Sequence, residues 1–255
     1  MNLYEAISVR KSIRKFEKRE IEKGLIEKLK RFTKELQPIF FHTSTEIFFH
    51  NIQEEMPIKK GRFCVEAPYY ISILSENSKE GQINAGFLME QIVLFLTCHG
   101  IATCYQGSVH FFADYRKGSV KKEWIVIAAG YPVPYLYREE NGAKRIPLAE
   151  QCYFKEEAGK QIITILKAAN LAPSAFNQQP WKFLVYTNRI HVMTRKETIF
   201  SKQFQINYFV DTGIALAHMA IAADELWLDM EWKVLENIQN QNLKRNYYTI
   251  TMIIK

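Results

Sequence analysis

The amino-acid sequence predicts an α+β protein made of two tandem repeats. The chain has 255 residues, 47% hydrophobic and 24% charged, a balance typical of globular proteins with one large or two small domains. Apolar residues recur at helical spacing in some segments and form short runs rich in β-branched residues in others. The order helix, strand, buried helix, strand occurs twice along the chain, which indicates the repeat.

The first half, taken as residues 1–150, contains three predicted helices. Residues 20–36 carry an apolar stripe on one side, which is typical of a surface helix. Residues 84–98 are apolar nearly all round, so this helix should be buried, and Gly100 stands where a helix-ending glycine is expected. The first half is therefore predicted to contain helices at 2–9, 20–36 and 84–98, strands at 45–49, 69–74 and 124–130, and a polar connector at 133–150.

The second half, taken as residues 151–255, repeats this order over a shorter length. Gly86 at the start of the first buried helix lies nineteen residues before Tyr105, and Gly213 lies nineteen residues before Trp232. Matched spacing of this kind favours a duplication. The elements predicted here are helices at 158–170 and 211–228 and strands at 181–187, 190–194 and 247–254.

Charge and cysteine content narrow the function classes. The net charge is +7, and residues 1–31 supply +5 of it, with ten basic and five acidic side chains. A local excess of this kind indicates one anion site beside a solvated helix rather than a nucleic-acid surface. The four cysteines are irregularly spaced, and neither a membrane-spanning run nor a signal peptide is expected. We expect a cytoplasmic protein that binds neither nucleic acid nor membrane.

A basic cluster at residues 10–14 suggests phosphate binding. Arg10, Lys11, Ser12 and Arg14 place three cations and a hydroxyl within five residues. Guanidinium groups offer paired donors to phosphate oxygens, and a serine hydroxyl adds a short one. The alternative is a solvated basic face at the end of a helix, where cations also complement the helix dipole.

A second cluster lies at residues 172–181, with the sequence APSAFNQQPW. Two prolines make this connection rigid, and Asn177 and Gln179 offer amides that both donate and accept hydrogen bonds. The alternative is a capped turn before a buried tryptophan. The amide content favours a binding loop, because a turn alone does not require so many polar side chains.

These clusters resemble the FMN-dependent nitroreductase family. APSAFNQQPW at 172–181 is similar to the family's AP-S-x-x-N-x-Q-P-W loop, and AISVRKSIRKF at 6–16 is similar to its RRSxRxF phosphate segment. Three weaker matches follow the family order: residues 100–107 resemble GLGTxWxG, residues 130–132 resemble GYP, and residues 143–147 resemble the basic RKPL tail. The resemblance implies a nitroreductase-like two-layer sandwich.

The chain departs from the family pattern in one respect. The loop normally follows the second helix of the same repeat, but here residues 37–44 have lost it and it occurs only in the second half. The second half lacks an RKSIR segment in turn. Family members are homodimers with FMN at the subunit interface. The chain therefore resembles a single-chain, tandem-repeat branch of the family, an internal pseudo-dimer that would be a monomer with one site.

The resemblance also implies roles for individual residues. Cofactor contacts fall into a phosphate group, a group at the flavin ring edge and face, and a group closing the ring and ribityl chain. The first comprises Arg10, Lys11, Ser12, Lys144 and Arg145, the second Arg14, Gln106 and Gly107, and the third Pro173, Ser174, Asn177 and Gln179. No catalytic side chain is implied, because flavin supplies the chemistry.

The implied function is FMN-dependent reduction of a small acceptor, such as a nitroaromatic, a quinone or a flavin, by NADH or NADPH. Two alternatives are a flavin-binding protein of this fold without turnover and a basic interaction protein without cofactor. The six histidines show no metal-ligand spacing, and no GxSxG motif supports Ser174 as a nucleophile. His218 is expected to be a hydrogen-bonded core residue, and Asp211 a residue at the start of a helix.

Overall fold

The computed structural model describes residues 1–61, 64–112, 120–133, 135–139, 142–239 and 244–255. The chain forms two compact units, Met1–Gly142 and Ala143–Lys255. Lys144 and Arg145 thus lie in the second unit, whereas the sequence placed them at the end of the first half. Residues 134, 140 and 141 of the predicted connector lie outside the described residues.

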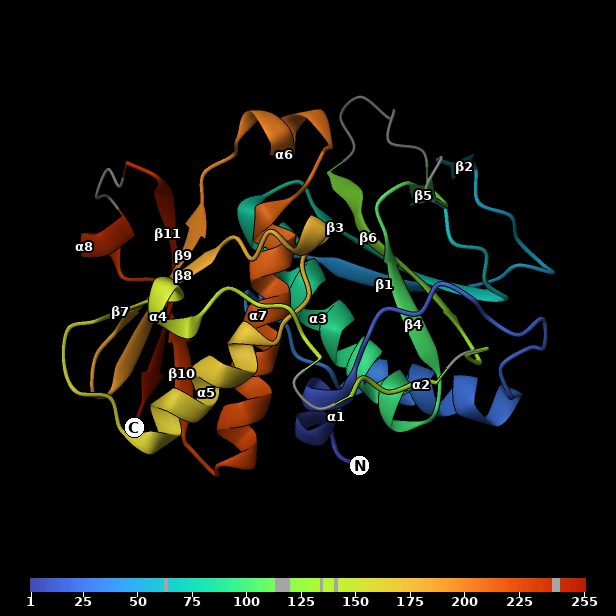
Figure 1. Cartoon of the computed structure of the whole chain (residues 1–255). Helices are drawn as coiled ribbons and strands as arrows, with labels where there is room; N and C mark the ends of the chain where they lie inside the picture. Colours follow the sequence, from blue (N-terminus) through green and yellow to red (C-terminus); the bar gives the residue numbers. More distant parts are fainter. Residues whose placement is uncertain (62–63, 113–119, 134, 140–141, 240–243) are drawn as a thin grey trace. The chain divides into compact units, whose positions relative to one another are not determined.

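The first unit is a four-stranded antiparallel sheet covered by helices (Figure 1). The strand order is β1-β3-β6-β4, and a separate pair, β2 and β5, forms a small ribbon. The helices are α1 (Leu3–Val9), α2 (Lys23–Glu35) and α3 (Lys79–Cys98). The strands are β1 (Thr45–Asn51), β2 (Lys59–Lys60), β3 (Tyr69–Glu76), β4 (Ala102–Gln106), β5 (Val109–His110) and β6 (Lys121–Gly130).

Helix α3 forms the core of the first unit. The Ser78 hydroxyl accepts from the Gly81 amide at 3.0 Å and so caps the helix start, five residues earlier than predicted. The helix contacts α1 and α2 as well as β1, β3, β4 and β6, which explains why it is apolar nearly all round. It ends at Cys98, as predicted, and Gly100 just beyond the cap has a φ of +78°, which is strain-free only for glycine.

The second unit is a five-stranded sheet of order β10-β11-β9-β8-β7, antiparallel except for the β7–β8 pair. Helices α5 and α7 pack against each other (Figure 1). The helices are α4 (Leu148–Gln151), α5 (Lys160–Asn170), the 3₁₀ turn η1 (Ala175–Asn177), α6 (Ile199–Gln203), α7 (Tyr208–Glu225) and α8 (Glu236–Gln239). The strands are β7 (Cys152–Phe154), β8 (Trp181–Val185), β9 (Arg189–Arg195), β10 (Met230–Lys233) and β11 (Asn246–Ile254).

The predicted helices and strands all exist, with shifted ends. The predicted connector at 133–150 is wrong at its end, because α4 begins at Leu148. No bounds are predicted from the sequence for β4 or β10, and none of the short elements β2, β5, β7, α6 and α8 is predicted. These pieces have two to five residues each, too few for a periodicity to stand out.

The two units share one order of elements. The first runs α2-β1-β3-α3-β4-β6 and the second runs α5-β8-β9-α7-β10-β11, leaving aside the short ribbon and the small helices. Their strand orders, β1-β3-β6-β4 and β8-β9-β11-β10, correspond strand for strand, with β7 added at the edge of the second. In each unit, the connection that follows the second helix, α2 or α5, leads into the first long strand, β1 or β8.

Candidate functional site

The basic cluster lies along strand β4 of the first unit. Arg10 caps the end of α1, and the chain beyond it pairs with β4 through a bridge between Ser12 and Thr103. The Ile13 amide donates to the Thr103 carbonyl at 2.9 Å, and the Ile13 side chain is buried. Since successive side chains of an extended segment point to opposite sides, Ser12 and Arg14 face away from the core. They are half-buried and exposed, respectively.

Arg10 itself is buried, at 5% exposure. Its Nε lies 3.8 Å from Oε1 of Glu90, a fully buried carboxylate of α3. Glu90 also accepts a hydrogen bond from the Tyr105 hydroxyl of β4. The solvated basic face is therefore wrong for Arg10, because its charge is placed among buried polar groups. It describes Arg14, which is exposed.

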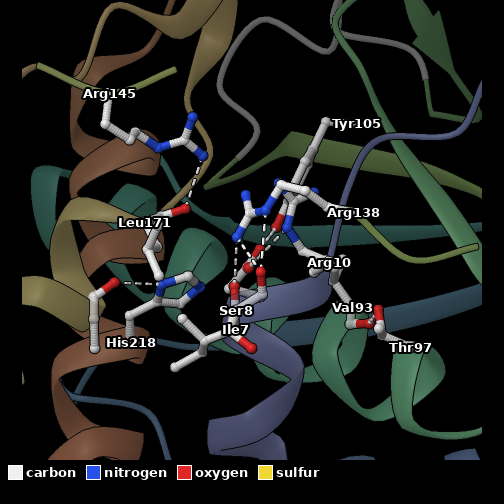
Figure 2. A network of polar contacts seen from close by, with 12 residues as sticks. Ile7, Ser8, Arg10, Val93, Thr97, Tyr105, Arg138, Arg145, Leu171 and His218 are labelled. Carbon is white, nitrogen blue, oxygen red and sulfur yellow. Dashed lines mark hydrogen bonds and ion pairs between the residues drawn. The ribbon is translucent and has the colours of Figure 1, made fainter. Parts of the chain in front are cut away.

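A cation that sequence reasoning missed, Arg138, secures the end of α1. Its Nε donates to the Ser8 carbonyl at 3.0 Å and its Nη2 to the Ile7 carbonyl at 3.1 Å (Figure 2). Burial, and then the charge of Arg10, lower the pKa of the Arg138 guanidinium. Cations favour helix C-termini. The available signal was one arginine shortly after the GYP motif, in a segment read as a connector.

Strand β4 ends beside an open position. The Gln106 side chain is held by the Val65 amide at 2.9 Å and the Cys104 carbonyl at 3.0 Å, so only its backbone is available to a ligand. Among the described residues, and apart from its two chain neighbours, no atom lies within 4 Å of the position that a Cβ of Gly107 would take. Burial raises the pKa of the Cys104 thiol, and the charges of Arg14 and Arg10 oppose this rise. The charges of both guanidinium groups are thus felt at the same residue of β4.

The second cluster forms a strained loop in the second unit, residues 174–179, which we call the amide loop. Phe176, Asn177 and Gln179 have φ values of 50°, 56° and 46°. Such backbone in non-glycine residues costs about 1–3 kcal/mol each and persists only where surrounding contacts hold it. Pro173 before the loop is buried, and Trp181 after it is fully buried.

Hydrogen bonds join the amide loop to the Lys144–Ile146 segment. Oε1 of Gln179 accepts from the Ile146 amide at 2.9 Å, and Nδ2 of Asn177 donates to the Lys144 carbonyl at 3.0 Å. Nε2 of Gln179 donates to the Asn177 carbonyl at 3.2 Å, and the Ser174 hydroxyl accepts from the Gln179 amide at 2.8 Å. The predicted residues of the second unit are thus brought together.

Arg145 links the same two segments. Its Nη1 donates to Oδ1 of Asn177 at 3.3 Å, and its Nη2 donates to the Leu171 carbonyl at 2.8 Å (Figure 2). The Lys144 side chain is exposed beside it. The structure therefore places one cation within the amide network and a second at its surface.

The Gln179 side chain is the centre of this network, so its loss should loosen the loop. We expect Gln179→Leu to lower the free energy of unfolding by about 1–3 kcal/mol, because the Ile146 amide loses its acceptor. Gln179→Glu keeps that acceptor and should recover part of the loss. Urea denaturation of the two variants measures the difference. Equal stability of Gln179→Leu and the wild-type protein would contradict the network described here.

Two residues beyond the loop complete its support. Oδ1 of Asp211, in the first turn of α7, accepts from the Ala175 amide at 3.1 Å. Nη2 of Arg195, at the end of β9, donates to Oε1 of Gln178 at 2.8 Å and to the Tyr208 hydroxyl at 2.9 Å. Burial raises the pKa of Asp211 to about 7. Asp211 was predicted only as a helix-start residue, and Arg195 was not predicted.

A family model described as "Putative TM nitroreductase" matches residues 2–223 of the chain. The matched range spans both units and contains both sequence clusters. The chain belongs to this nitroreductase family.

A solved relative with this architecture supports the fold over the whole chain. A crystal structure described as a "putative nitroreductase" from Thermotoga maritima MSB8 aligns with 100% of this chain and 94% of its own length, with a TM-score of 0.66 and 23% identity. At this identity the likeness shows a nitroreductase fold.

Two further solved structures align with about half of this chain. An FMN-dependent nitroreductase from Clostridium difficile R20291 covers 53% of the chain and 91% of its own, with 18% identity and a TM-score of 0.42. A nitroreductase with bound FMN from Desulfitobacterium hafniense DCB-2 covers 55% and 94%, with 13% identity and a TM-score of 0.42. No curated protein matches the sequence significantly.

The histidine and metal-site candidates of the chain show no sign of a reactive role within the residues that the structure describes. His218 of α7 is fully buried, and its Nδ1 lies 2.9 Å from the Ala168 carbonyl, as expected for a hydrogen-bonded core residue. Within the described ranges, no three His, Cys, Asp or Glu side chains gather as a metal site. No helix in the described part of the chain is long and apolar enough to cross a membrane.

Proposed function

We propose that this chain is an FMN-dependent NAD(P)H oxidoreductase that reduces a small acceptor such as a nitroaromatic, a quinone or a flavin. The observation that carries the proposal is the alignment of the basic segment with β4. Ser12 pairs with this strand, the charges of Arg10 and Arg14 act on its Cys104 thiol, and Gly107 follows its end, where the described residues leave the Cβ position open. Cations, a hydroxyl and an unobstructed backbone on one strand suit a phosphorylated planar ligand.

The donor groups of each unit are proposed to bind different parts of FMN. Arg10, Ser12 and the less central Lys11 would bind the phosphate, and Arg14 would lie at the pyrimidine edge of the ring. The backbone of Gln106 and Gly107 would face the ring. In the second unit, Lys144 and Arg145 are proposed as further phosphate cations, and the ring and ribityl chain would meet Pro173, Ser174, Asn177 and Gln179.

The protein contributes binding and charge rather than a reacting side chain. FMN, when bound, would supply the chemistry of hydride transfer from NADH or NADPH to the acceptor. Arg14 would favour negative charge on the ring, since a cation near N1 and O2 stabilises it. The amide loop would orient the ring through fixed hydrogen bonds, because Asp211 holds its Ala175 amide and Arg195 holds its Gln178 side chain.

We also propose that the two units arose by tandem duplication. Their matching element order and strand order support this proposal. The RKSIR segment remains only in the first unit and the PSAFNQQPW loop only in the second. This complementary loss is what a fused pair retaining a single flavin site would leave behind.

The decisive experiment is reduction of bound flavin by NAD(P)H. We expect the purified full chain to show flavin absorbance, and anaerobic addition of NADH or NADPH to bleach it. Flavin absorbance without bleaching would indicate a flavin-binding protein without turnover. Failure to bind FMN at all would favour a basic interaction protein and would overturn the proposal.

The asymmetry of the motifs predicts the stoichiometry. We expect one FMN per chain, bound by a chain that is monomeric in solution, because each motif occurs once. Flavin titration combined with light scattering measures both quantities in the same sample. Two flavins per chain, or binding confined to a dimer fraction, would contradict this prediction.

A further inference from the structure

The buried helices of the two units carry a polar side chain at the same place. Asn84 lies two residues before Gly86 in α3, and Asp211 lies two residues before Gly213 in α7. Asn84 is fully buried, and Asp211 is 5% exposed. Buried polar groups in apolar helices persist where they hold a hydrogen-bond partner.

Both side chains bind the connection that follows the second helix of their unit. Oδ1 of Asn84 accepts from the Phe40 amide at 3.0 Å, and Nδ2 donates to the Phe40 carbonyl at 2.9 Å. Oδ1 of Asp211 accepts from the Ala175 amide at 3.1 Å. Phe40 lies five residues beyond Glu35, the end of α2, and Ala175 lies five residues beyond Asn170, the end of α5. A side chain of the buried helix thus binds the connection at equivalent places in the two units, and we call this contact the tether.

The tethered segments differ in their backbone. Residues 36–44 of the first unit, all of them described, contain no residue with positive φ. In the second unit, three of the four residues after Ala175 adopt positive φ. A strained segment of this kind needs anchors, since its relaxed alternatives lie about 1–3 kcal/mol lower per residue. The tether at Ala175 therefore stabilises a strained backbone, whereas the tether at Phe40 holds a segment without such strain.

The two side chains also differ in how far they are satisfied. Both polar atoms of Asn84 bind Phe40, whereas Oδ2 of Asp211 is buried with no hydrogen-bond partner among the described residues. The charged group near Asp211 is Arg195 of β9, which itself binds Gln178 of the loop and the Tyr208 hydroxyl. Asp211 and Arg195 thus hold the amide loop at Ala175 and Gln178.

We propose that Asp211 is a positioning residue for the flavin, which sets the amide loop in its binding geometry through the Ala175 amide, and that Asn84 is its counterpart in the unit that has lost the loop. The inference rests on the proposed function for its link to FMN. The tether itself rests only on the contacts within each unit. An asparagine at position 211 would retain the Oδ1 acceptor, as Asn84 does toward Phe40.

The test compares Asp211→Ala, Asp211→Asn and Asn84→Ala in the full chain. The first readout is amide hydrogen exchange of residues 175–179 without ligand, and the second is FMN affinity by titration. We expect Asp211→Ala to raise exchange in the amide loop and to weaken FMN about tenfold or more, and Asp211→Asn to restore both to within about threefold. Asn84→Ala, the matched control, should destabilise the chain while leaving loop exchange and FMN affinity nearly unchanged.

The outcomes separate this inference from the proposed function. If the wild-type chain binds no FMN but Asp211→Ala selectively raises loop exchange, the proposed function fails and the tether stands. If FMN binds and Asp211→Ala weakens it no more than Asn84→Ala does, Asp211 is a purely structural residue and the inference is overturned. Failure of Asp211→Asn to rescue either readout would also overturn it, because the acceptor would then not be what positions the loop.

Discussion

Replacing Arg10 by glutamine should weaken FMN binding about ten- to a hundredfold and leave riboflavin binding much less affected. Only FMN carries the phosphate dianion, and the loss of one charge-assisted hydrogen bond costs about 1.5–3 kcal/mol. Glutamine keeps a donor and removes the charge, so the effect reports the charge. Titration of both flavins into the same variant measures the FMN preference directly.

The structure changes how this variant must be controlled. Arg10 is the cation 3.8 Å from the buried Glu90 carboxylate, and breaking a buried ion pair costs about 3–5 kcal/mol. The Arg10→Gln/Glu90→Gln double variant removes both charges and so isolates flavin binding from stability. Glu90→Gln alone should lower stability and preserve the preference for FMN. An equal loss of FMN and riboflavin in the double variant would show that Arg10 serves Glu90 alone.

Local periodicity predicted the main elements because the buried and exposed faces of each long element stay the same from one end to the other. Residues 84–98 are apolar nearly all round because α3 contacts helices as well as the sheet. Residues 20–36 carry a stripe because α2 keeps an exposed face. The repeated order of helices and strands could be predicted for the same reason. The ends of the elements could not be predicted, because α3 begins where Ser78 caps it rather than where its apolar run begins.

The partners of the candidate residues could not be predicted, because they are far apart in the sequence. Glu90 follows Arg10 by 80 positions, and Arg138 reaches Ser8 across 130. Spacing assigns a residue to a face of its own element and says nothing about which other element meets that face. A signal was nevertheless present: Glu90 is the one acid in the run AGFLMEQIVLFLTC. A buried acid of this kind requires a partner.

The amide loop was located from its composition, but its conformation was not. Prolines and amides indicated rigidity at 172–181, whereas the positive φ of Phe176 and Gln179 follows from anchors elsewhere in the fold. The roles of these residues toward FMN stay predictions. Both clusters have defined local geometry, which makes each role testable by substitution, with a double variant where the residue is also half of a buried ion pair.

The largest pH effect should come from Asp211. We expect the free energy of unfolding of the wild-type chain to fall, relative to that of Asp211→Asn, as pH rises from about 4 to about 7. Burial raises the pKa of this carboxyl to about 7 in the folded state, against the Ala175 amide and the charge of Arg195, which both lower it. The value in an unfolded chain is about 3.9.

The sign follows from proton binding. Between the two pKa values the folded chain keeps the Asp211 proton and the unfolded chain has lost it, so raising the pH favours unfolding. Three pKa units correspond to about 4 kcal/mol, all of it present below pH 4 and lost by pH 7 to 8. Asparagine does not titrate, so the Asp211→Asn variant does not lose this part of the free energy of unfolding as the pH rises.

Urea denaturation at pH 4, 5.5, 7 and 8 measures this difference, and the matched control is Asp224→Asn, which removes an exposed carboxylate from the same helix. The control should follow the wild-type profile, because Asp224 is exposed whereas Asp211 is buried. Parallel profiles for Asp211→Asn and the wild-type chain would contradict the prediction. They would mean that the carboxyl ionises at an ordinary pH in the folded chain, with its Oδ2 hydrated and the tether to Ala175 carrying a full charge.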